Sequence, residues 1–219
     1  MALFSPIASA AAAPEQLSLA LHEDGPTSMS VTWVSLDPWS PSTTGAVTWA
    51  PAGGGAPSSS PATAHTYTAG FGWSGTNFFA VMTGLTPGAP YTYSVTSNGA
   101  SSPPRSFTAA PPLNASAALK VGVLADMGSV ELFGFTVAAA FIKEHAVAPF
   151  DLTLIAGDLS YATVDPPKAE FQRLWDLWGL QNENFSSTAP FMMTVCVLRP
   201  PLCRPRLPRF PHLPPPPLR

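Results

Sequence analysis

The chain has 219 residues, which is enough for one large or two small domains. Charged residues make up 11% of it and hydrophobic residues 46%, which excludes a disordered polyelectrolyte. Five basic and thirteen acidic residues precede residue 199, so this part carries a net charge of −8, and nucleic acid is not expected as a partner. No apolar run approaches transmembrane length, so no membrane span is expected either.

Residues 1–13 are rich in alanine and other small residues. They fit the end of a signal peptide that lacks a positive N-terminal region, and they equally fit a frayed start of the chain. Two Asn-x-Ser sequons follow later, at Asn114 and Asn184, and both are glycosylation candidates if the chain enters the secretory pathway.

Residues 14–116 predict an antiparallel β-sandwich. Turn-forming residues recur about every ten positions, and short runs of alternating apolar and polar residues lie between them. Seven such runs in about a hundred residues are typical of a sandwich. They begin near Leu17, Met29, Val47, His65, Phe78, Tyr91 and Arg105. The Gly-, Pro- and Ser-rich segment 51–61 predicts a flexible loop.

This first domain contains no cluster of catalytic residues. His22 and His65 are isolated and are interpreted as surface or packed histidines. Trp33, Trp49 and Trp73 allow two interpretations, an exposed platform for a ligand or the core of the sandwich. We favour the core, since tryptophan commonly packs the interior of sandwiches.

Residues 117–197 change character and predict a β-α-β-α-β unit. The first strand is nearly all apolar, as in parallel strands that are covered on both faces. The first helix places Phe135, Ala139, Ile142 and Ala146 on one stripe. The predicted elements are strands at 119–125, 152–157 and 190–195 and helices at 132–146 and 168–180.

Two aspartates follow the first two predicted strands. Asp126 and Asp158 are each accompanied by a glycine, and Tyr161 comes three residues after the second. Their separation fits one βαβ unit, and two parallel strands would lie about 4.8 Å apart. Both carboxylates would then reach one ion, or two ions about 3.5–4 Å apart. Turn formation or helix capping is the alternative for a single Asp, but two in register with a tyrosine favour metal ligands.

These residues resemble a known family. Ala-Asp-Met-Gly at 125–128 and Gly-Asp-Leu-Ser-Tyr at 157–161 are similar to the first two motif blocks of the purple acid phosphatases, a branch of the binuclear metallophosphoesterases. The segments 26–33 and 72–75 resemble the N-terminal domain of the plant-type enzymes. Leu85-Thr-Pro-Gly-Ala-Pro-Tyr91 resembles the tyrosine corner of fibronectin type III-like domains, in which the phenol bonds back to the preceding turn.

The resemblance implies a fibronectin type III-like sandwich followed by a partial α/β metallophosphoesterase domain. It implies a secreted acid phosphatase that hydrolyses phosphate monoesters. Asp126 would bind Fe(III), Asp158 would bridge it to a second divalent metal (Zn, Mn or Fe), and Tyr161 would bind the iron and give the purple colour.

After Val195 the chain departs from the family pattern. Cys-Val-Leu-Arg at 196–199 stands where the family has Gly-Asn-His-Glu, and residues 198–219 form a Pro- and Arg-rich tail. The resemblance then implies an incomplete metal centre and a chain that is inactive by itself. The tail predicts an extended, disordered polyproline-like segment. The alternative function is a binding module, in which the sandwich recognises a partner and the catalytic half is vestigial.

Overall fold

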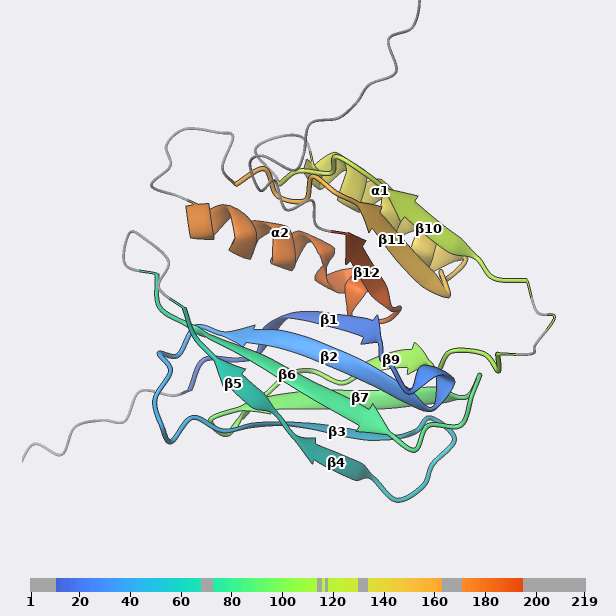
Figure 1. Cartoon of the computed structure of the whole chain (residues 1–219), viewed down its shortest axis with the longest axis horizontal. Helices are drawn as coiled ribbons and strands as arrows, with labels where there is room; N and C mark the ends of the chain where they lie inside the picture. The colour runs from blue at the N-terminus through green and yellow to red at the C-terminus, as the bar shows by residue number, and fades with distance from the viewer. Residues whose placement is uncertain are drawn as a thin grey trace, which may run out of the picture.

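The structure is a computed structural model that describes residues 11–67, 73–113, 116, 118–129, 134–162 and 171–194. Within these residues a β-sandwich is followed by a small parallel sheet with two helices (Figure 1). The predicted fold class, a fibronectin type III-like sandwich followed by an α/β unit, is therefore confirmed.

The sandwich consists of two antiparallel sheets joined by alternating buried side chains. One sheet has the order β1-β2-β6-β5 and the other the order β4-β3-β7-β8, with β9 also paired to β7. A short 3-10 turn, η1 (Gly25–Thr27), precedes β2. The strands are β1 (Glu15–Leu21), β2 (Ser28–Ser35), β3 (Gly45–Pro51), β4 (Ser58–Pro61), β5 (Thr63–His65), β6 (Thr76–Thr83), β7 (Pro90–Ser97), β8 (Ala100–Ser101) and β9 (Arg105–Thr108).

The segment 51–61 was expected to be a loop throughout, and this is wrong for its second half. Strand β4 pairs with β3, with Ser58 opposite Trp49. It is formed by backbone pairing and by a hydrogen bond from the Ser59 hydroxyl to the Val47 carbonyl (3.1 Å), not by apolar alternation. An edge strand with exposed serines carries no hydrophobic period, so the sequence pattern does not reveal it.

The sandwich core follows the predicted alternation. Of the three tryptophans, Trp33 and Trp49 belong to this core, as expected. Trp33 and Trp49 are 1% and 6% exposed. Trp33 stacks on Phe78 with ring centroids 5.2 Å apart and donates its indole N–H to the Ser97 hydroxyl (2.9 Å). The predicted tyrosine corner is also present, because the Tyr91 hydroxyl accepts the Thr86 backbone N–H at 2.8 Å.

The second unit has the predicted order β-α-β-α-β, and its strands pair in parallel as expected. The order across the sheet is β10-β11-β12, with Val121 opposite Leu152 and Leu154 opposite Met192. None of the described helices has the length and apolarity needed to cross a membrane. The elements are β10 (Val121–Leu124), α1 (Gly134–Val147), β11 (Leu152–Ala156), α2 (Phe171–Ser186) and β12 (Phe191–Thr194).

Among the described residues, the parallel sheet is covered on one face only, although its first strand has the apolar composition of strands covered on both faces. A Cβ at Gly122 would collide with the Phe141 ring of α1, so this strand and α1 are in close contact. On the opposite face Val121, Val123 and Leu154 are 40%, 66% and 39% exposed. The strands are apolar on both faces, but α1 and α2 contribute to the same core cluster. Among the described residues, the opposite face therefore has no covering helix.

The predicted apolar stripe of α1 is confirmed for Ile142, which packs against the core, but its other members are displaced by a rotation of about one residue. Phe135 is 56% exposed, whereas Ala138 is 1% exposed and Phe141 packs into the core. Gly134 allows the start of the helix to approach the Gly128 carbonyl so closely that any Cβ would clash with it. This contact sets the rotation of α1 on the sheet, and the hydrophobic period alone does not encode it.

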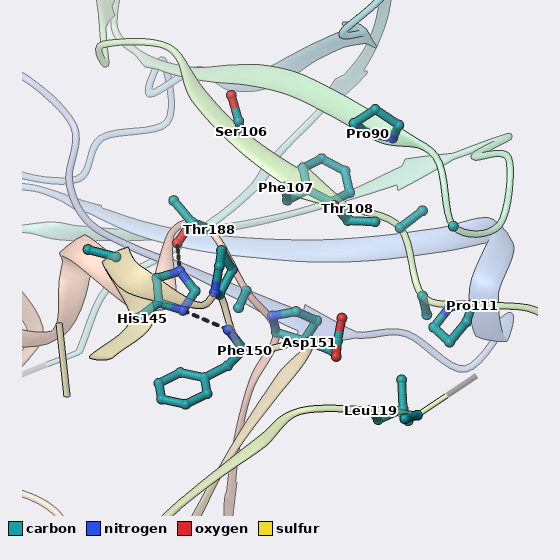
Figure 2. Close-up of a pocket in the computed structure, with 18 of the residues that line it drawn as sticks. Pro90, Ser106, Phe107, Thr108, Pro111, Leu119, His145, Phe150, Asp151 and Thr188 are labelled. Carbon is teal, nitrogen blue, oxygen red and sulfur yellow. Dashed lines mark hydrogen bonds between the residues drawn. The ribbon is translucent and has the colours of Figure 1, made fainter. Parts of the chain in front are cut away.

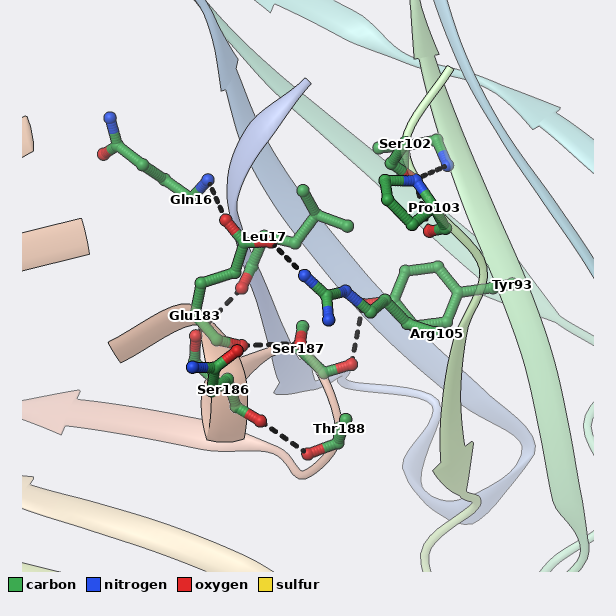
Figure 3. A network of polar contacts seen from close by, with 12 residues as sticks. Gln16, Leu17, Tyr93, Ser102, Pro103, Arg105, Glu183, Ser186, Ser187 and Thr188 are labelled. Atoms are coloured by element: carbon green, nitrogen blue, oxygen red, sulfur yellow. Dashed lines mark hydrogen bonds and ion pairs between the residues drawn. The ribbon is translucent and has the colours of Figure 1, made fainter. Parts of the chain in front are cut away.

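Helix α2 joins the two units. Gly179 faces Gln16 of β1 at a distance that leaves no room for a Cβ. Near the end of α2 the Ser186 hydroxyl donates to the Leu17 carbonyl (2.9 Å), and the Tyr93 hydroxyl donates to the Ser187 carbonyl (2.8 Å) (Figure 3). These contacts explain why α2 continues six residues beyond its predicted end at residue 180: its last turns are polar, but they are buried against the sandwich.

Glu183 is the centre of this contact between α2 and the sandwich. Its carboxylate accepts the Gln16 backbone N–H at 2.7 Å and the Arg105 guanidinium at 2.6 Å (Figure 3). A register shift in β1 and a positive φ of 59° at Gln16 turn that N–H out of the sheet and towards the helix. The sandwich and the α/β unit are therefore joined by specific polar contacts.

Candidate metal centre

The two aspartates predicted as ligands lie side by side at the carboxyl edge of the parallel sheet. Asp126 follows β10 and Asp158 follows the adjacent strand β11. The turns that carry them are tied together by a hydrogen bond from the Gly128 N–H to the Leu159 carbonyl (2.8 Å). Parallel pairing brings the ends of both strands to one edge, where ligand sites of open α/β sheets form.

Tyr161 completes the cluster. Its hydroxyl donates to Asp126 Oδ1 at 2.6 Å and lies 3.2 Å from Asp158 Oδ2. The pKa of the Tyr161 phenol is raised above its ordinary value, mainly by the hydrogen bond to Asp126 and further by partial desolvation and by Asp158. The cause is that two nearby carboxylates favour the neutral phenol over the phenolate. The structure thus brings together all three predicted oxygen donors.

The backbone of all three residues is strained. Asp126, Asp158 and Tyr161 have φ values of 50°, 45° and 53°, in the left-handed region. Aspartate tolerates this conformation, but it is unusual for an aromatic residue. Such residues cost about 1–3 kcal/mol each and concentrate at functional sites. Three strained positions in one hydrogen-bonded cluster therefore indicate a site, and not three independent turns.

The donor set is made of hard oxygens. Two carboxylates and a phenol suit hard cations such as Fe(III), and they match soft or imidazole-preferring metals less well. The described residues contain no group of three or more His, Cys, Asp and Glu side chains that could hold a metal ion. The third donor of this cluster is a tyrosine, which is not one of those four residue types.

The described histidines lie elsewhere. His145, near the end of α1, lines a cavity of about 600 Å³ together with Leu119 and Asp151, at the opposite edge of the sheet (Figure 2). Its Nδ1 accepts the Phe150 backbone N–H (3.0 Å), so Nε2 carries the proton and donates to the Thr188 hydroxyl (2.9 Å). Burial, and then the charge of Lys120, lower the pKa of His145.

The remaining histidines are accounted for in the same way. His22 contacts the Ser28 hydroxyl (3.3 Å) and His65 ends β5, so both belong to the sandwich. His212 lies outside the described residues. No imidazole among the described residues therefore takes part in the Asp126–Asp158–Tyr161 cluster.

The third tryptophan of the proposed platform lies at the junction of the two units. Trp73 stacks on Tyr67 with centroids 4.9 Å apart and donates its indole N–H to Asp176 of α2 (3.1 Å). With Trp33 and Trp49 in the core, the three tryptophans do not form the exposed aromatic face that a binding module would need.

The predicted glycosylation sites, tail and signal segment lie only partly within the described residues. Asn184 is exposed on α2, but Ser186 of the same sequon is 3% exposed and is bonded to Leu17. Asn114 and the Pro- and Arg-rich tail at 198–219 lie outside the described residues, as does the possible signal segment up to residue 10.

Sequence reasoning missed one residue beside the site. Gln181 of α2 donates its side-chain N–H to the Gly128 carbonyl at 2.8 Å, next to the turn that carries Asp126. A glutamine beyond the predicted end of a helix gives no recognisable signal, because only the burial of that helix end places it here.

Comparison with known proteins gives a family-model match for the first part of the chain and structural matches that cover most of it. Residues 14–109 match the family model of the purple acid phosphatase N-terminal domain. Purple acid phosphatase PPD1 from yellow lupin (Lupinus luteus) seeds is 24% identical with a TM-score of 0.71, over 84% of this chain and 35% of the lupin chain. The structure of PhoD is 14% identical with a TM-score of 0.56, over 84% and 39%. These likenesses show the fold, and the chain spans about a third of the lupin protein's length. No curated protein matches the sequence.

Proposed function

We propose that the chain, whose residues 14–109 match the family model of the purple acid phosphatase N-terminal domain, belongs to a secreted phosphatase that hydrolyses phosphate monoesters at a binuclear metal centre. Asp126 and Tyr161 would hold Fe(III), and Asp158 would serve both this ion and a second divalent metal, Zn, Mn or Fe. The observation that supports this proposal is the convergence of the Tyr161 hydroxyl on both carboxylates, at 2.6 and 3.2 Å.

The three side chains have distinct tasks in this proposal. Asp158 follows the strand between β10 and β12, and its two carboxylate oxygens allow it to serve two cations. Asp126 and Tyr161, which are already joined by a hydrogen bond, would serve one cation once the phenol has lost its proton. Metals bound there would supply an activated water and hold the phosphate oxygens.

We further propose that the 219-residue chain binds a hard cation but does not turn over substrate. Its third motif is replaced by Cys-Val-Leu-Arg at 196–199, and the described histidines lie away from the cluster. The chain therefore presents oxygen donors without the amide and imidazole groups that the family uses for the second metal and for the leaving group.

Secretion and glycosylation belong to the same proposal. Asn184 is the candidate that the structure describes, and a glycan there is added before α2 docks, since Ser186 is sealed against the sandwich in the folded chain. Mass spectrometry of the protein from a eukaryotic secretory host tests this point.

The proposal is tested with the purified chain and Fe(III). We expect a visible charge-transfer absorption band that saturates with added iron and is absent from Tyr161→Phe. An iron titration that gives no such band would contradict the assignment of Tyr161. A parallel assay at acid pH, with iron plus zinc or manganese and a generic phosphomonoester, is expected to show no turnover. Turnover at rates typical of the family would contradict the predicted inactivity.

A further inference from the structure

The turn after β10 is fixed on three sides. The Met127 side chain is 2% exposed and lies in the core cluster. The Gly128 N–H donates to the Leu159 carbonyl at 2.8 Å. The Gly128 carbonyl, on the other side of the same residue, accepts the side-chain N–H of Gln181 at 2.8 Å. Core packing, the neighbouring turn and α2 therefore each hold one part of the turn that carries Asp126.

The Gln181 contact is the one that depends on a side-chain donor. The Gly128 backbone is buried, and Gly134 packs against its carbonyl without room for a Cβ. Water therefore has little access to this oxygen if the glutamine N–H is removed. A buried carbonyl without a partner is costly, so the peptide would turn towards solvent and move Asp126, two residues away.

The orientation of the Gln181 amide follows from its surroundings. Its Oε1 is buried and has no hydrogen-bond partner among the described residues. Reversing the amide would place Oε1 against the Gly128 carbonyl, so that two acceptors would face each other. The N–H group of the Gln181 amide therefore faces the Gly128 carbonyl, and this hydrogen bond fixes the orientation of the amide.

We propose that Gln181 is a positioning residue for the strand-end site: by holding the Gly128 carbonyl it keeps Asp126 within reach of Tyr161 and Asp158. The claim that Gln181 supports a metal site rests on the proposed function, whereas the claim that Gln181 holds the turn does not. Helix α2 is a firm support for this role, since Glu183 and Asp176 of the same helix bond to the sandwich.

The experiment compares Gln181→Met with Gln172→Met in the full chain. Gln172 lies on the same helix, but it faces the sandwich, where it accepts the Tyr67 hydroxyl at 2.5 Å. Both substitutions replace an amide by a thioether of similar length. In metal-free protein, we expect hydrogen exchange of residues 126–129 to rise about tenfold in Gln181→Met and to stay unchanged in Gln172→Met.

Terbium(III), a hard trivalent cation, then probes the site through its sensitised luminescence. We expect its affinity to fall about tenfold in Gln181→Met and to remain at the wild-type value in Gln172→Met. Gln181→Glu is expected to lose affinity at neutral pH, where a carboxylate cannot donate, and to approach the wild type at acid pH, where the protonated acid can. Gln181→Met is not expected to regain affinity at acid pH.

The outcomes separate the two claims. Wild-type protein that binds no terbium at this cluster contradicts the proposed function, and hydrogen exchange then decides the role of Gln181 alone. Unchanged exchange and unchanged terbium affinity in folded Gln181→Met overturn the inference. Should Gln181→Met fail to fold, the Gln181→Glu protein at two pH values decides, and equal behaviour relative to wild type at both would overturn it.

Discussion

Removal of the Glu183 carboxylate should loosen the contact between the sandwich and α2. The side chain is 15% exposed and its partner Arg105 is 27% exposed. Its two hydrogen bonds, to the Gln16 N–H and the Arg105 guanidinium, are 2.7 and 2.6 Å long. Bonds to a charged group contribute about 1.5–3 kcal/mol each. With part of the ion pair screened by solvent, Glu183→Ala should cost about 3 kcal/mol of unfolding free energy.

A second variant, Glu183→Gln, should have an intermediate effect. Glu183→Gln keeps an oxygen acceptor for the Gln16 N–H but loses the ion pair with Arg105, so it should cost about half as much. In a chain of this size about 3 kcal/mol corresponds to a fall of roughly 6–12 °C in the unfolding midpoint. Thermal unfolding followed by circular dichroism measures both values.

The control is Glu144→Ala, which removes another glutamate paired at short distance. Glu144 bonds Lys120 at 2.8 Å, but its side chain is 61% exposed, and exposed pairs contribute little. Its unfolding midpoint should therefore match that of the wild type. If Glu183→Ala is no less stable than Glu144→Ala, the polar contacts do not join the two units and the reasoning fails.

Three further predictions concern the fold. Tyr91→Phe removes the hydroxyl that accepts the Thr86 N–H and should cost about 1 kcal/mol in urea unfolding; an unchanged midpoint would mean that water replaces the phenol. His145 has a lowered pKa in the folded chain, so the unfolded chain takes up its proton first and stability is lost as pH falls below about 6.5. His145→Gln should therefore lose less stability than the wild type between pH 7.5 and 5.5, and equal slopes would exclude this role. Val123→Lys, on the exposed sheet face, should reduce aggregation in light scattering, and no reduction would show that this face does not drive association.

The sequence was informative where side chains alternate or where a motif fixes a turn. The alternation in β1, β2, β6 and β7 predicted the sandwich, and Tyr91 predicted its corner. Asp126 and Asp158 were identified because strand ends and glycines accompany them, and Tyr161 was identified through the resemblance to the Gly-Asp-Leu-Ser-Tyr motif block. Their convergence follows from parallel pairing, which the spacing of one βαβ unit already suggests.

The features that were missed depend on contacts between elements. Ser58–Pro61 forms a strand by backbone pairing to β3, without an apolar period. The rotation of α1 is set by the approach of Gly134 to Gly128, and the length of α2 by burial of its polar end against Leu17 and Tyr93. Gln181 belongs to the same class, because its role depends on where α2 lies and not on its sequence neighbours.

Whether the three oxygen donors form one site for a hard cation can be measured in a crystal of the chain soaked with Fe(III), with diffraction data collected at the iron absorption edge. We expect one anomalous peak within coordination distance of Asp126, Asp158 and Tyr161, with the phenol no longer donating to Asp126. No peak at this cluster, with the 2.6 Å contact between Tyr161 and Asp126 intact, would contradict this expectation.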